Sequence, residues 1–456
     1  MKVRILLSIL VCRLLRFFSR LLHRGGTAMP GRIALKIYPD LLAFLAQEVI
    51  VIAVTGTNGK TTSSRMIEEA FSEQNLSYFA NRSGANLLSG ITTEFVMNSS
   101  VFGKTNKEYA VIECDEAAAV QVFPQLHPRI IVVTNLFRDQ LDRYGEVTHT
   151  LSNIRNAIRS VPESKLCLNA DCSLTASLAN DLPNSVVYFG IDKDAAPSAE
   201  KPVVSDATHC IRCKTEYTYH YITYGHLGGF ECPKCGYHRE NADYAVTKVI
   251  RQNPECSSIQ MRTRTNTFTA EINLPAMYNI YNAAGAIAAI MEIGFSEEIA
   301  VKAVGNFQCG FGRMEKFNLG GGTRLMLAKN PAGFNQILEF LKKANDSFTL
   351  VLCLNDRSAD GTDISWIWDV DFETLSAFGN NLKAIYVSGD RAADMHLRIK
   401  YSGFPTEYIH EEKSYENLVQ NLASSGEQIF IIPTYTAMLD LRKVLIRRCG
   451  GADFWE

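Results

Sequence analysis

Long hydrophobic runs are missing from this chain of 456 residues. Residues 1–24 are apolar and basic, but arginines interrupt the apolar stretches there, and no segment of the chain is long enough to cross a bilayer. The same region has no small-residue cleavage site, which argues against a secretory signal peptide. The net charge is only −2 at pH 7, which excludes a global attraction to nucleic acid or to an anionic membrane. Any such attraction must come from a local patch.

Internal repeats, low-complexity tracts and long linkers are absent as well, which excludes repeat architectures and largely disordered chains. With 46% hydrophobic and 21% charged residues, the composition is that of an ordinary globular protein. A chain of this length is expected to form two or three domains.

The first 39 residues contain no acidic residue, and the first one in the chain is Asp40. Arg13, Arg16, Arg20 and Arg24 recur at helical spacing and would form one stripe, with leucine and phenylalanine on the other faces. This pattern fits a helix that lies on an anionic membrane. It also fits a helix packed on its own domain with the arginines in solvent. Residues 1–48 are therefore predicted to be a basic amphipathic segment, with peripheral membrane association as one interpretation.

Twelve cysteines are many for an intracellular enzyme, so their spacing matters. Four of them form two CxxC pairs that are eighteen residues apart: Cys210, Cys213, Cys232 and Cys235. Each pair can place two thiolates on one ion, and two pairs close a tetrahedral site, the usual arrangement of a structural Zn²⁺. Disulfides are the alternative, which a reducing cytoplasm disfavours. The other eight are interpreted as small buried hydrophobic residues: Cys12, Cys114, Cys167, Cys172, Cys256, Cys309, Cys353 and Cys449.

Apolar strands alternate with helical patterns along much of the chain. Strands are predicted at residues 49–54, 109–113, 129–133, 166–168 and 186–189, and helices at 63–73 and 147–161. Such alternation predicts an α/β fold with a parallel sheet covered on both faces. We expect a central domain over residues 49–314, interrupted by an inserted four-cysteine zinc ribbon at 206–241, and a C-terminal Rossmann-like α/β domain over 315–456.

The strongest chemical signal is GTNGKTT at residues 56–62, between a predicted strand and a predicted helix. Glycines let successive backbone N–H groups face phosphate oxygens, and the following helix adds a favourable dipole. Lys60 would reach the β- and γ-phosphates, and Thr61 would bind Mg²⁺. Val54 stands where the strict phosphate-loop pattern has its first glycine, so a glycine turn with an exposed lysine is the alternative. The predicted phosphate-binding residues are Gly56, Thr57, Asn58, Gly59, Lys60, Thr61 and Thr62.

A Mg²⁺ site also needs a carboxylate, and three follow the strand predicted at residues 109–113: Glu113, Asp115 and Glu116. A carboxylate at the C-terminal end of a neighbouring parallel strand lies on the ligand side of the sheet. Glu113 is therefore predicted to bind Mg²⁺ together with Thr61. A solvated acidic turn is the alternative.

The phosphate loop is one of six ordered motifs that resemble the Mur ligase superfamily. The other five are TNLFRDQLD at 134–142, LNAD at 168–171, YNIYNAA at 278–284, GRME at 312–315 and KNP at 329–331. Gln140 and Tyr278 depart from the family pattern, which has histidines there. The resemblance implies a Mur-ligase-type central domain that uses ATP to activate a carboxylate as an acyl phosphate before an amide is formed. It also implies that Asn282 lies near the adenine or ribose and Arg313 near the nucleotide.

The four-cysteine insert and DGTDISWIWD at residues 360–369 resemble one subgroup, the synthetase subunits of lipid II isoglutaminyl synthases. This resemblance implies that the D-glutamate α-carboxylate of lipid II becomes D-isoglutamine, with ammonia from a separate GatD-like glutaminase subunit in a heterodimer. It further implies that Asp363 completes the catalytic triad of that glutaminase in trans, with Asp360 and Asp356 as alternatives. An aspartate before Ile-Ser-Trp-Ile also suits a helix N-cap, which is the structural alternative for Asp363.

Two other functions remain open. A stand-alone Mur-type ligase that adds an amino acid to a cell-wall precursor would carry the same ATP motifs. A zinc-ribbon NTPase that acts on nucleic acid would need a basic, aromatic-studded face, which the sequence does not offer. We expect no nucleic-acid partner and a cytoplasmic location, with the inner face of the plasma membrane as a further option.

Overall fold

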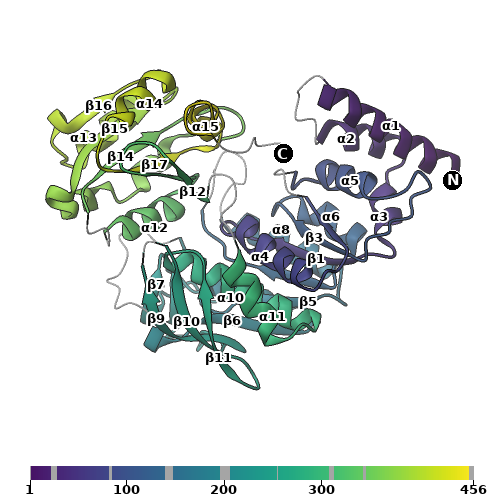
Figure 1. Cartoon of the computed structure of the whole chain (residues 1–456). Helices are drawn as coiled ribbons and strands as arrows, with labels where there is room; N and C mark the ends of the chain where they lie inside the picture. Colours follow the sequence, from purple (N-terminus) through teal and green to yellow (C-terminus); the bar gives the residue numbers. More distant parts are fainter. Residues whose placement is uncertain are drawn as a thin grey trace. The chain divides into compact units, whose positions relative to one another are not determined.

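The computed structural model describes residues 2–21, 28–81, 85–138, 147–195, 206–253, 255–307, 313–342 and 346–450, with the backbone alone at Arg20 and Arg313. These residues form two compact units, which are coloured along the chain in Figure 1. The first unit takes the described residues of Met1–Phe137 and Val147–Phe307. The second takes those of Arg138–Glu146 and Gln308–Glu456.

A nine-stranded sheet forms the centre of the first unit, in the order β11-β10-β9-β6-β5-β4-β1-β3-β2. The seven strands from β9 to β2 in this order pair parallel, and β10 and β11 add an antiparallel edge. The predicted parallel core is confirmed, whereas the β10–β11 edge was not predicted. The strands are β1 Ile50–Thr55, β2 Tyr78–Ala80, β3 Tyr109–Glu113, β4 Ile130–Val133, β5 Lys165–Asn169, β6 Val186–Ile191, β9 Tyr244–Gln252, β10 Ser257–Arg262 and β11 Thr267–Ile272.

Strand β1 lies between β3 and β4, and nearly all of it is buried. Val54 of β1 is in register with Glu113 of β3 on one side and with Val132 of β4 on the other. The carboxyl ends of these three strands therefore meet at one edge of the sheet, where open α/β sheets bind their ligands. Helix α4 begins at Lys60 and so starts at this same edge.

Helices α4, α10 and α11 pack against one another, and α4 and α10 also contact the sheet. Helix α10 is buried along most of its length because its alanines and Gly285 let it lie close to the strands. The helices of this unit after β1 are α4 Lys60–Glu73, α5 Leu88–Met97, α6 Ala119–Leu126, α8 Val147–Arg159, α9 Ser173–Ala176, α10 Met277–Ile293 and α11 Glu297–Asn306, with short 3-10 turns η1 Ser177–Ala179 and η2 Lys193–Ala195.

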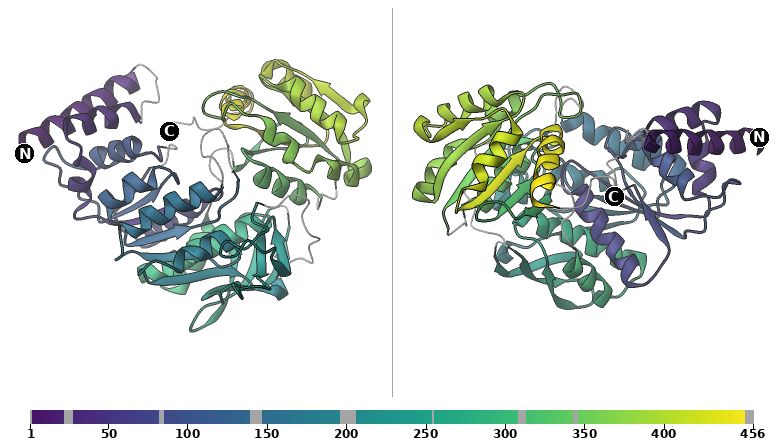
Figure 2. Two further views of the ribbon diagram at one scale, coloured as in Figure 1. Left: turned by 180° about the vertical axis from the view of Figure 1, so that it is seen from behind. Right: turned by 45° about the horizontal axis from the view of Figure 1, so that its top comes forward.

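Three helices precede β1: α1 Lys2–Leu21, α2 Ala28–Ile37 and α3 Leu41–Ala46. Helices α1 and α2 lie side by side and both contact α5 (Figures 1 and 2). The approach of α2 to α5 is so close that a Cβ at Gly31 would lie 1.9 Å from the carbonyl oxygen of Ser89. Among the described residues, no helix combines the length and the apolar character that crossing a membrane requires.

Helix α1 packs on its own domain, as one of the two interpretations expected, but Arg13 and Arg16 do not lie in solvent. Arg16 is buried, and the partly buried Arg13 donates hydrogen bonds to the carbonyl oxygens of Val96 (3.3 Å) and Ser99. The reason is that Arg16 follows Ile5, Ile9 and Cys12 along the helix face that packs on the domain. Of the leucines and phenylalanines expected on the other faces, Leu14, Phe17, Phe18 and Leu21 are exposed and Leu15 is partly exposed. Arg24 and the side chain of Arg20 lie outside the described part of the chain.

The insert contains a two-stranded antiparallel sheet, β7 Thr218–Tyr224 and β8 Leu227–Glu231, between its two cysteine pairs. This hairpin was not predicted because the segment has little regular apolar alternation. Its strands nevertheless carry Tyr and Phe side chains that pack together inside the insert.

The second unit is built on a six-stranded sheet in the order β12-β13-β17-β14-β15-β16. All pairs are parallel except β12 with β13. Along β14, Leu350 and Leu352 enter one apolar core and Val351 and Cys353 enter the other, as expected for a sheet covered on both faces. The predicted Rossmann-like arrangement is confirmed. Its strands are β12 Arg313–Phe317, β13 Thr323–Met326, β14 Phe348–Cys353, β15 Leu382–Ser388, β16 Ile409–Glu411 and β17 Gln428–Pro433, and its helices are α12 Pro331–Leu341, α13 Ala392–Tyr401, α14 Tyr415–Ala423, α15 Tyr435–Cys449, η3 Ser365–Asp369, η4 Phe372–Asn381 and η5 Thr406–Tyr408.

Candidate functional site

The predicted phosphate loop joins β1 to α4, and two of its glycines are required by its geometry. Gly56 and Gly59 have φ angles of 118° and 88°, which side-chain-bearing residues rarely adopt. A Cβ at Gly56 would lie 2.4 Å from Thr134 Oγ1, and one at Gly59 would lie 1.9 Å from Asn282 Oδ1. The loop is therefore pressed between the segment that follows β4 and helix α10.

The segment after β4 braces the first half of the loop. The Thr57 N–H donates to the Asn135 carbonyl oxygen at 2.8 Å, and the Asn58 N–H donates to Asn135 Oδ1 at 3.0 Å. The Phe137 N–H donates to Thr57 Oγ1 at 3.0 Å. Since these two loop amides are engaged, the first turn of α4 is the part that can offer N–H donors to an anion. Asn135 was quoted from the sequence only as part of a motif, and its role in the loop was not predicted.

Lys60 is buried at the start of α4, and its ammonium group donates to the loop backbone and to a carboxylate, with the Thr57 carbonyl oxygen as the most distant acceptor at 3.4 Å. It donates to the Gly56 carbonyl oxygen at 2.5 Å and to Glu116 Oε1 at 2.6 Å. Burial alone would lower the pKa of Lys60, but the charges of Glu116 and Glu113 outweigh it and raise that pKa above its usual value. The alternative of an exposed lysine in a glycine turn is therefore wrong. Glu116 was noted in the sequence but not selected.

Thr61 and Glu113 meet at the carboxyl end of β3, as predicted. The Thr61 hydroxyl donates to Glu113 Oε2 at 2.7 Å. Asn81 fixes the backbone of Glu113, because its Oδ1 accepts from the Glu113 N–H at 2.9 Å and its Nδ2 donates to the Glu113 carbonyl at 2.7 Å. Hydroxyl and carboxylate oxygens are the donors that Mg²⁺ prefers. Asp115 instead caps the next turn, where it accepts from the Ala117 N–H at 3.0 Å.

Asn282 lies on α10 directly beside the loop. Its Nδ2 donates to Asn279 Oδ1 at 3.2 Å, and its carbonyl oxygen accepts from the Ser63 hydroxyl at 3.2 Å. Thr62 is buried in the first turn of α4. The first unit therefore gathers the predicted phosphate-loop residues, Glu113 and Asn282 at one edge of its sheet.

The NxD turn after β5 connects three parts of the first unit. Asn169 Nδ2 donates to the Thr134 carbonyl at 2.9 Å. Asp171 is fully buried and accepts from Arg239 Nε at 2.5 Å, from the Tyr281 hydroxyl at 2.5 Å and from the Ile191 N–H at 2.8 Å. Arg239 belongs to the insert and Tyr281 to α10, so this carboxylate ties the insert to the domain. Sequence reasoning missed Arg239 because it is 68 residues from Asp171 in the chain.

Replacing Asp171 by alanine is expected to destabilise the protein by about 3–5 kcal/mol, because it removes the closer and fully buried carboxylate partner of the largely buried Arg239. Urea unfolding would measure the change. The matched control is Asp192→Ala, since Asp192 pairs with the same arginine at 3.5 Å but is partly exposed, and its loss should cost about 1 kcal/mol or less. Equal costs for the two variants would contradict the role given to Asp171.

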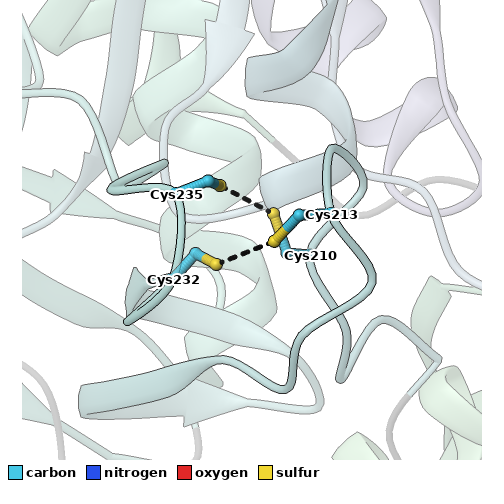
Figure 3. A group of neighbouring side chains, drawn as sticks. All are labelled: Cys210, Cys213, Cys232 and Cys235. Carbon is cyan, nitrogen blue, oxygen red and sulfur yellow. Dashed lines mark hydrogen bonds between the residues drawn. The ribbon is translucent and has the colours of Figure 1, made fainter.

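The four predicted metal ligands of the insert converge (Figure 3). Their Sγ atoms all lie within 4.8 Å of one another. Cys210 Sγ is 3.5 Å from Cys235 Sγ, and Cys213 Sγ is 3.4 Å from Cys232 Sγ, so each close pair joins the two CxxC turns. Sulfurs at the corners of a tetrahedron with metal bonds of about 2.3 Å would be about 3.8 Å apart. The cluster therefore has the size and the donor set of a Cys₄ metal site.

The two CxxC turns have the same backbone structure. The Cys210 N–H donates to the Thr215 carbonyl and the Cys232 N–H to the Tyr237 carbonyl, both at 2.7 Å. A left-handed residue follows each second cysteine, Lys214 with φ 63° and Gly236 with φ 71°. The hydrogen bonds with Thr215 lower the pKa of Cys213 to about 6, which favours the thiolate that binds metals.

The tip of the β7–β8 hairpin reaches the segment that braces the phosphate loop. The His226 ring lies 4.5 Å from that of Phe137, and His226 Nε2 is 3.5 Å from Cys172 Sγ. Burial alone would raise the pKa of Cys172, but the hydrogen bond with His226 outweighs it and lowers that pKa below its usual value. Cys172 is thus buried, as predicted, but its contact is polar.

The other scattered cysteines follow the prediction in part. Cys12, Cys114, Cys167 and Cys353 are buried, whereas Cys256 and Cys449 are only partly buried. Cys309 lies outside the described residues.

In the second unit, the three candidate aspartates differ in their surroundings. Asp360 is buried and accepts from the Thr436 N–H at 2.7 Å, and burial raises its pKa above the usual value. Asp356 forms an ion pair with Arg391 at 3.0 Å. Asp363 is partly exposed, and its Oδ1 accepts from the Ser365 N–H at 2.8 Å. This bond ties Asp363 to the first residue of η3.

The remaining family motifs lie partly outside the described residues. The side chain of Arg313 and residues 139–146, which include Gln140, are not among the described parts of the chain. Glu315 of the GRME motif binds Arg442 at 2.8 Å, and Asn330 of the KNP motif caps α12 through the Gly333 N–H at 2.8 Å. Both of these contacts are structural.

Comparison with protein families gives two matches along the chain. The Mur ligase middle domain matches residues 54–238, which hold the phosphate loop and the cysteine cluster. The MurT ligase C-terminal family matches residues 327–438, which hold Asp363. Solved structures with the same fold include a pseudomurein peptide ligase type C from Methanothermus fervidus (TM-score 0.67, 20% identity, 90% of this chain and 80% of that one). Another is MurF from Acinetobacter baumannii (TM-score 0.65, 16% identity, 90% and 80%).

Relatives that are similar over nearly the whole chain carry a more specific name. "Lipid II isoglutaminyl synthase (glutamine-hydrolyzing) subunit MurT" of Streptococcus pneumoniae is 34% identical over 450 residues, which cover 98% of each chain. The protein of the same name from Staphylococcus aureus is 33% identical and covers 98% of this chain and 99% of that one. Together with the two domain matches, these similarities show that the chain belongs to the MurT family of ATP-dependent Mur ligases.

Proposed function

We propose that this chain is the synthetase subunit of an enzyme that amidates the D-glutamate α-carboxylate of lipid II to D-isoglutamine. The observation that carries the proposal is the similarity, over 98% of the chain, to relatives named as subunits of a glutamine-hydrolysing lipid II isoglutaminyl synthase. The words "glutamine-hydrolyzing" and "subunit" in those names support glutamine as the nitrogen source and a second chain in the enzyme. Here that chain is proposed to be a GatD-like glutaminase.

The chemistry proposed for the first unit is activation of the carboxylate by ATP. A carboxylate oxygen attacks the γ-phosphorus, ADP leaves, and an acyl phosphate forms. Ammonia then attacks the acyl carbon, and inorganic phosphate leaves as the amide forms. Lys60 and the N–H donors of α4 would stabilise the charge on the transferring phosphoryl group. Mg²⁺, held by Thr61 and Glu113, would neutralise phosphate charge.

The remaining nucleotide contacts rest on the family resemblance. Asn282 is proposed to contact the nucleotide, which is consistent with its position against Gly59. Arg313 is proposed to add a positive charge near the nucleotide. The cysteine cluster is proposed to hold a structural Zn²⁺, because four thiolates leave no position open for a substrate.

The test of this function is a product assay. The purified chain, together with a class I glutamine amidotransferase subunit, should convert lipid II to its amidated form with glutamine and ATP. Mass spectrometry of the muropeptide would detect the change from carboxylate to carboxamide. The chain alone should need ammonium salts in place of glutamine. A product that has gained an amino acid would instead establish the stand-alone ligase.

Asp363 is proposed to orient the histidine of the glutaminase in trans. Its partial exposure and its fixed position at η3 suit this role, whereas the buried Asp360 is engaged by Thr436. The variant Asp363→Asn is expected to lower glutamine-dependent amidation by about 10²–10⁴-fold, as loss of the third member of a triad does. Amidation driven by ammonium salts should stay unchanged, because the ATP site is intact.

The matched control is Asp369→Asn, a partly exposed aspartate at the end of the same segment, which should keep both activities. Parallel loss of both activities in Asp363→Asn would indicate a structural role. Retention of both would assign the triad role elsewhere.

A further inference from the structure

Helix α1 presents a continuous apolar stripe to solvent. Its members recur at helical spacing, and Leu14 and Phe17 at its centre are 56% and 62% exposed. The stripe consists of Val3, Leu6, Leu7, Leu10, Leu14, Phe17, Phe18 and Leu21. A contiguous exposed apolar patch of this kind marks a surface that binds a protein, a membrane or a ligand.

The opposite face of α1 packs against the domain. Ile5, Ile9 and Cys12 are buried against the domain, and the Ser8 hydroxyl donates to the Ala34 carbonyl of α2 at 2.6 Å. The helix therefore cannot turn its apolar stripe inward without losing these contacts. The described residues of the first unit leave the stripe uncovered.

The exposed charges of α1 and of the neighbouring α2 have one sign. Lys2 and Arg4 are exposed, and at 100° per residue they lie on either side of Val3. Arg32 and Lys36 of the neighbouring α2 are exposed as well. The sequence has no acidic residue before Asp40, so no carboxylate of this segment opposes them.

We propose that α1 is a membrane-docking helix that lies parallel to an anionic bilayer, with the apolar stripe at the headgroup–acyl boundary. Apolar side chains in the middle and basic side chains at the rim fit a surface that is apolar inside and anionic outside. A second copy of the chain fits less well, because a parallel pair of stripes would bring the Lys2 and Arg4 side chains together, and an antiparallel pair would offer them no carboxylate from this segment. The proposal does not depend on the amidation chemistry, although a lipid-linked substrate would lie in the same surface.

Co-sedimentation of the full-length protein with lipid vesicles tests this proposal. Vesicles of phosphatidylcholine with a minor fraction of phosphatidylglycerol should bind the wild type, and pure phosphatidylcholine vesicles should bind it less. The double variant Leu14→Glu/Phe17→Glu is expected to lower the partition coefficient about tenfold or more, because it places carboxylates in the apolar stripe. Both side chains are exposed, so the fold should persist.

The matched control is Ile250→Glu/Leu397→Glu, which adds the same charge at residues that are 50% and 46% exposed elsewhere on the protein. It should bind vesicles like the wild type, and both variants should keep the rate of ATP hydrolysis without vesicles. Equal vesicle binding by the stripe variant and the wild type would overturn the proposal. The proposal would also be overturned by a second result. In that case the wild type binds no vesicles and sediments as a dimer without lipid, whereas the stripe variant sediments as a monomer.

Discussion

Replacing Lys60 by methionine is expected to lower the rate of ATP-dependent amidation by about 10²–10³-fold, because a charge aimed at the transferring phosphoryl group is lost. The same change removes the ion pair with Glu116, whose Oε1 lies 2.6 Å from Lys60 Nζ. Hydrogen bonds to charged groups contribute about 1.5–3 kcal/mol, so the variant should also be less stable. Turnover assays and urea unfolding would measure the two effects separately.

A second variant separates chemistry from folding. In Lys60→Met/Glu116→Gln the buried carboxylate is neutral, so most of the lost stability should return. The activity should not return, because the phosphate-binding charge is still missing. Normal amidation by a folded Lys60→Met protein would be incompatible with the proposed ATP site.

Replacing Cys232 by serine is expected to abolish metal binding by the insert and to unfold it. Structural zinc sites supply on the order of 10 kcal/mol of binding free energy at neutral pH, which a small module cannot replace. The wild type should contain one zinc per chain and the variant none, as measured by elemental analysis. Thermal unfolding should begin at a lower temperature, because Tyr217 and Phe230 of the insert would lose their packing.

The matched control for this change is Cys256→Ser, a partly exposed cysteine outside the cluster, which should keep the zinc and the melting temperature. Treatment of the wild type with a strong chelator should reproduce the effect of Cys232→Ser. A wild-type protein without zinc whose four cysteines form disulfides would contradict the proposed site.

The parts of the site that the sequence predicted are those that depend on neighbouring residues. The β1–loop–α4 unit has its strand, glycines and helix within one short segment, and each CxxC turn is fixed by four consecutive residues. Glu113 was predicted from a single rule on strand ends, and it lies beside Thr61 as that rule requires.

The parts that were missed depend on contacts between distant segments. Glu116 lies only three residues after Glu113, but its contact with Lys60 spans 56 residues. The contacts of Asp171 with Arg239 and of Cys172 with His226 join the insert to the central domain over 68 and 54 residues. No periodic pattern marks such pairs. For α1, the arginine spacing was visible, but only tertiary packing decided which face is inside.

The contact of Lys60 with Glu116 has a consequence for how nucleotide and cation affect each other's binding. A phosphate that draws the Lys60 ammonium toward itself takes positive charge away from Glu116 and from the nearby Glu113. A divalent cation beside Thr61 and Glu113 would return that charge to the same cluster. Nucleotide and cation should therefore strengthen each other's binding by the same factor, as thermodynamic reciprocity requires.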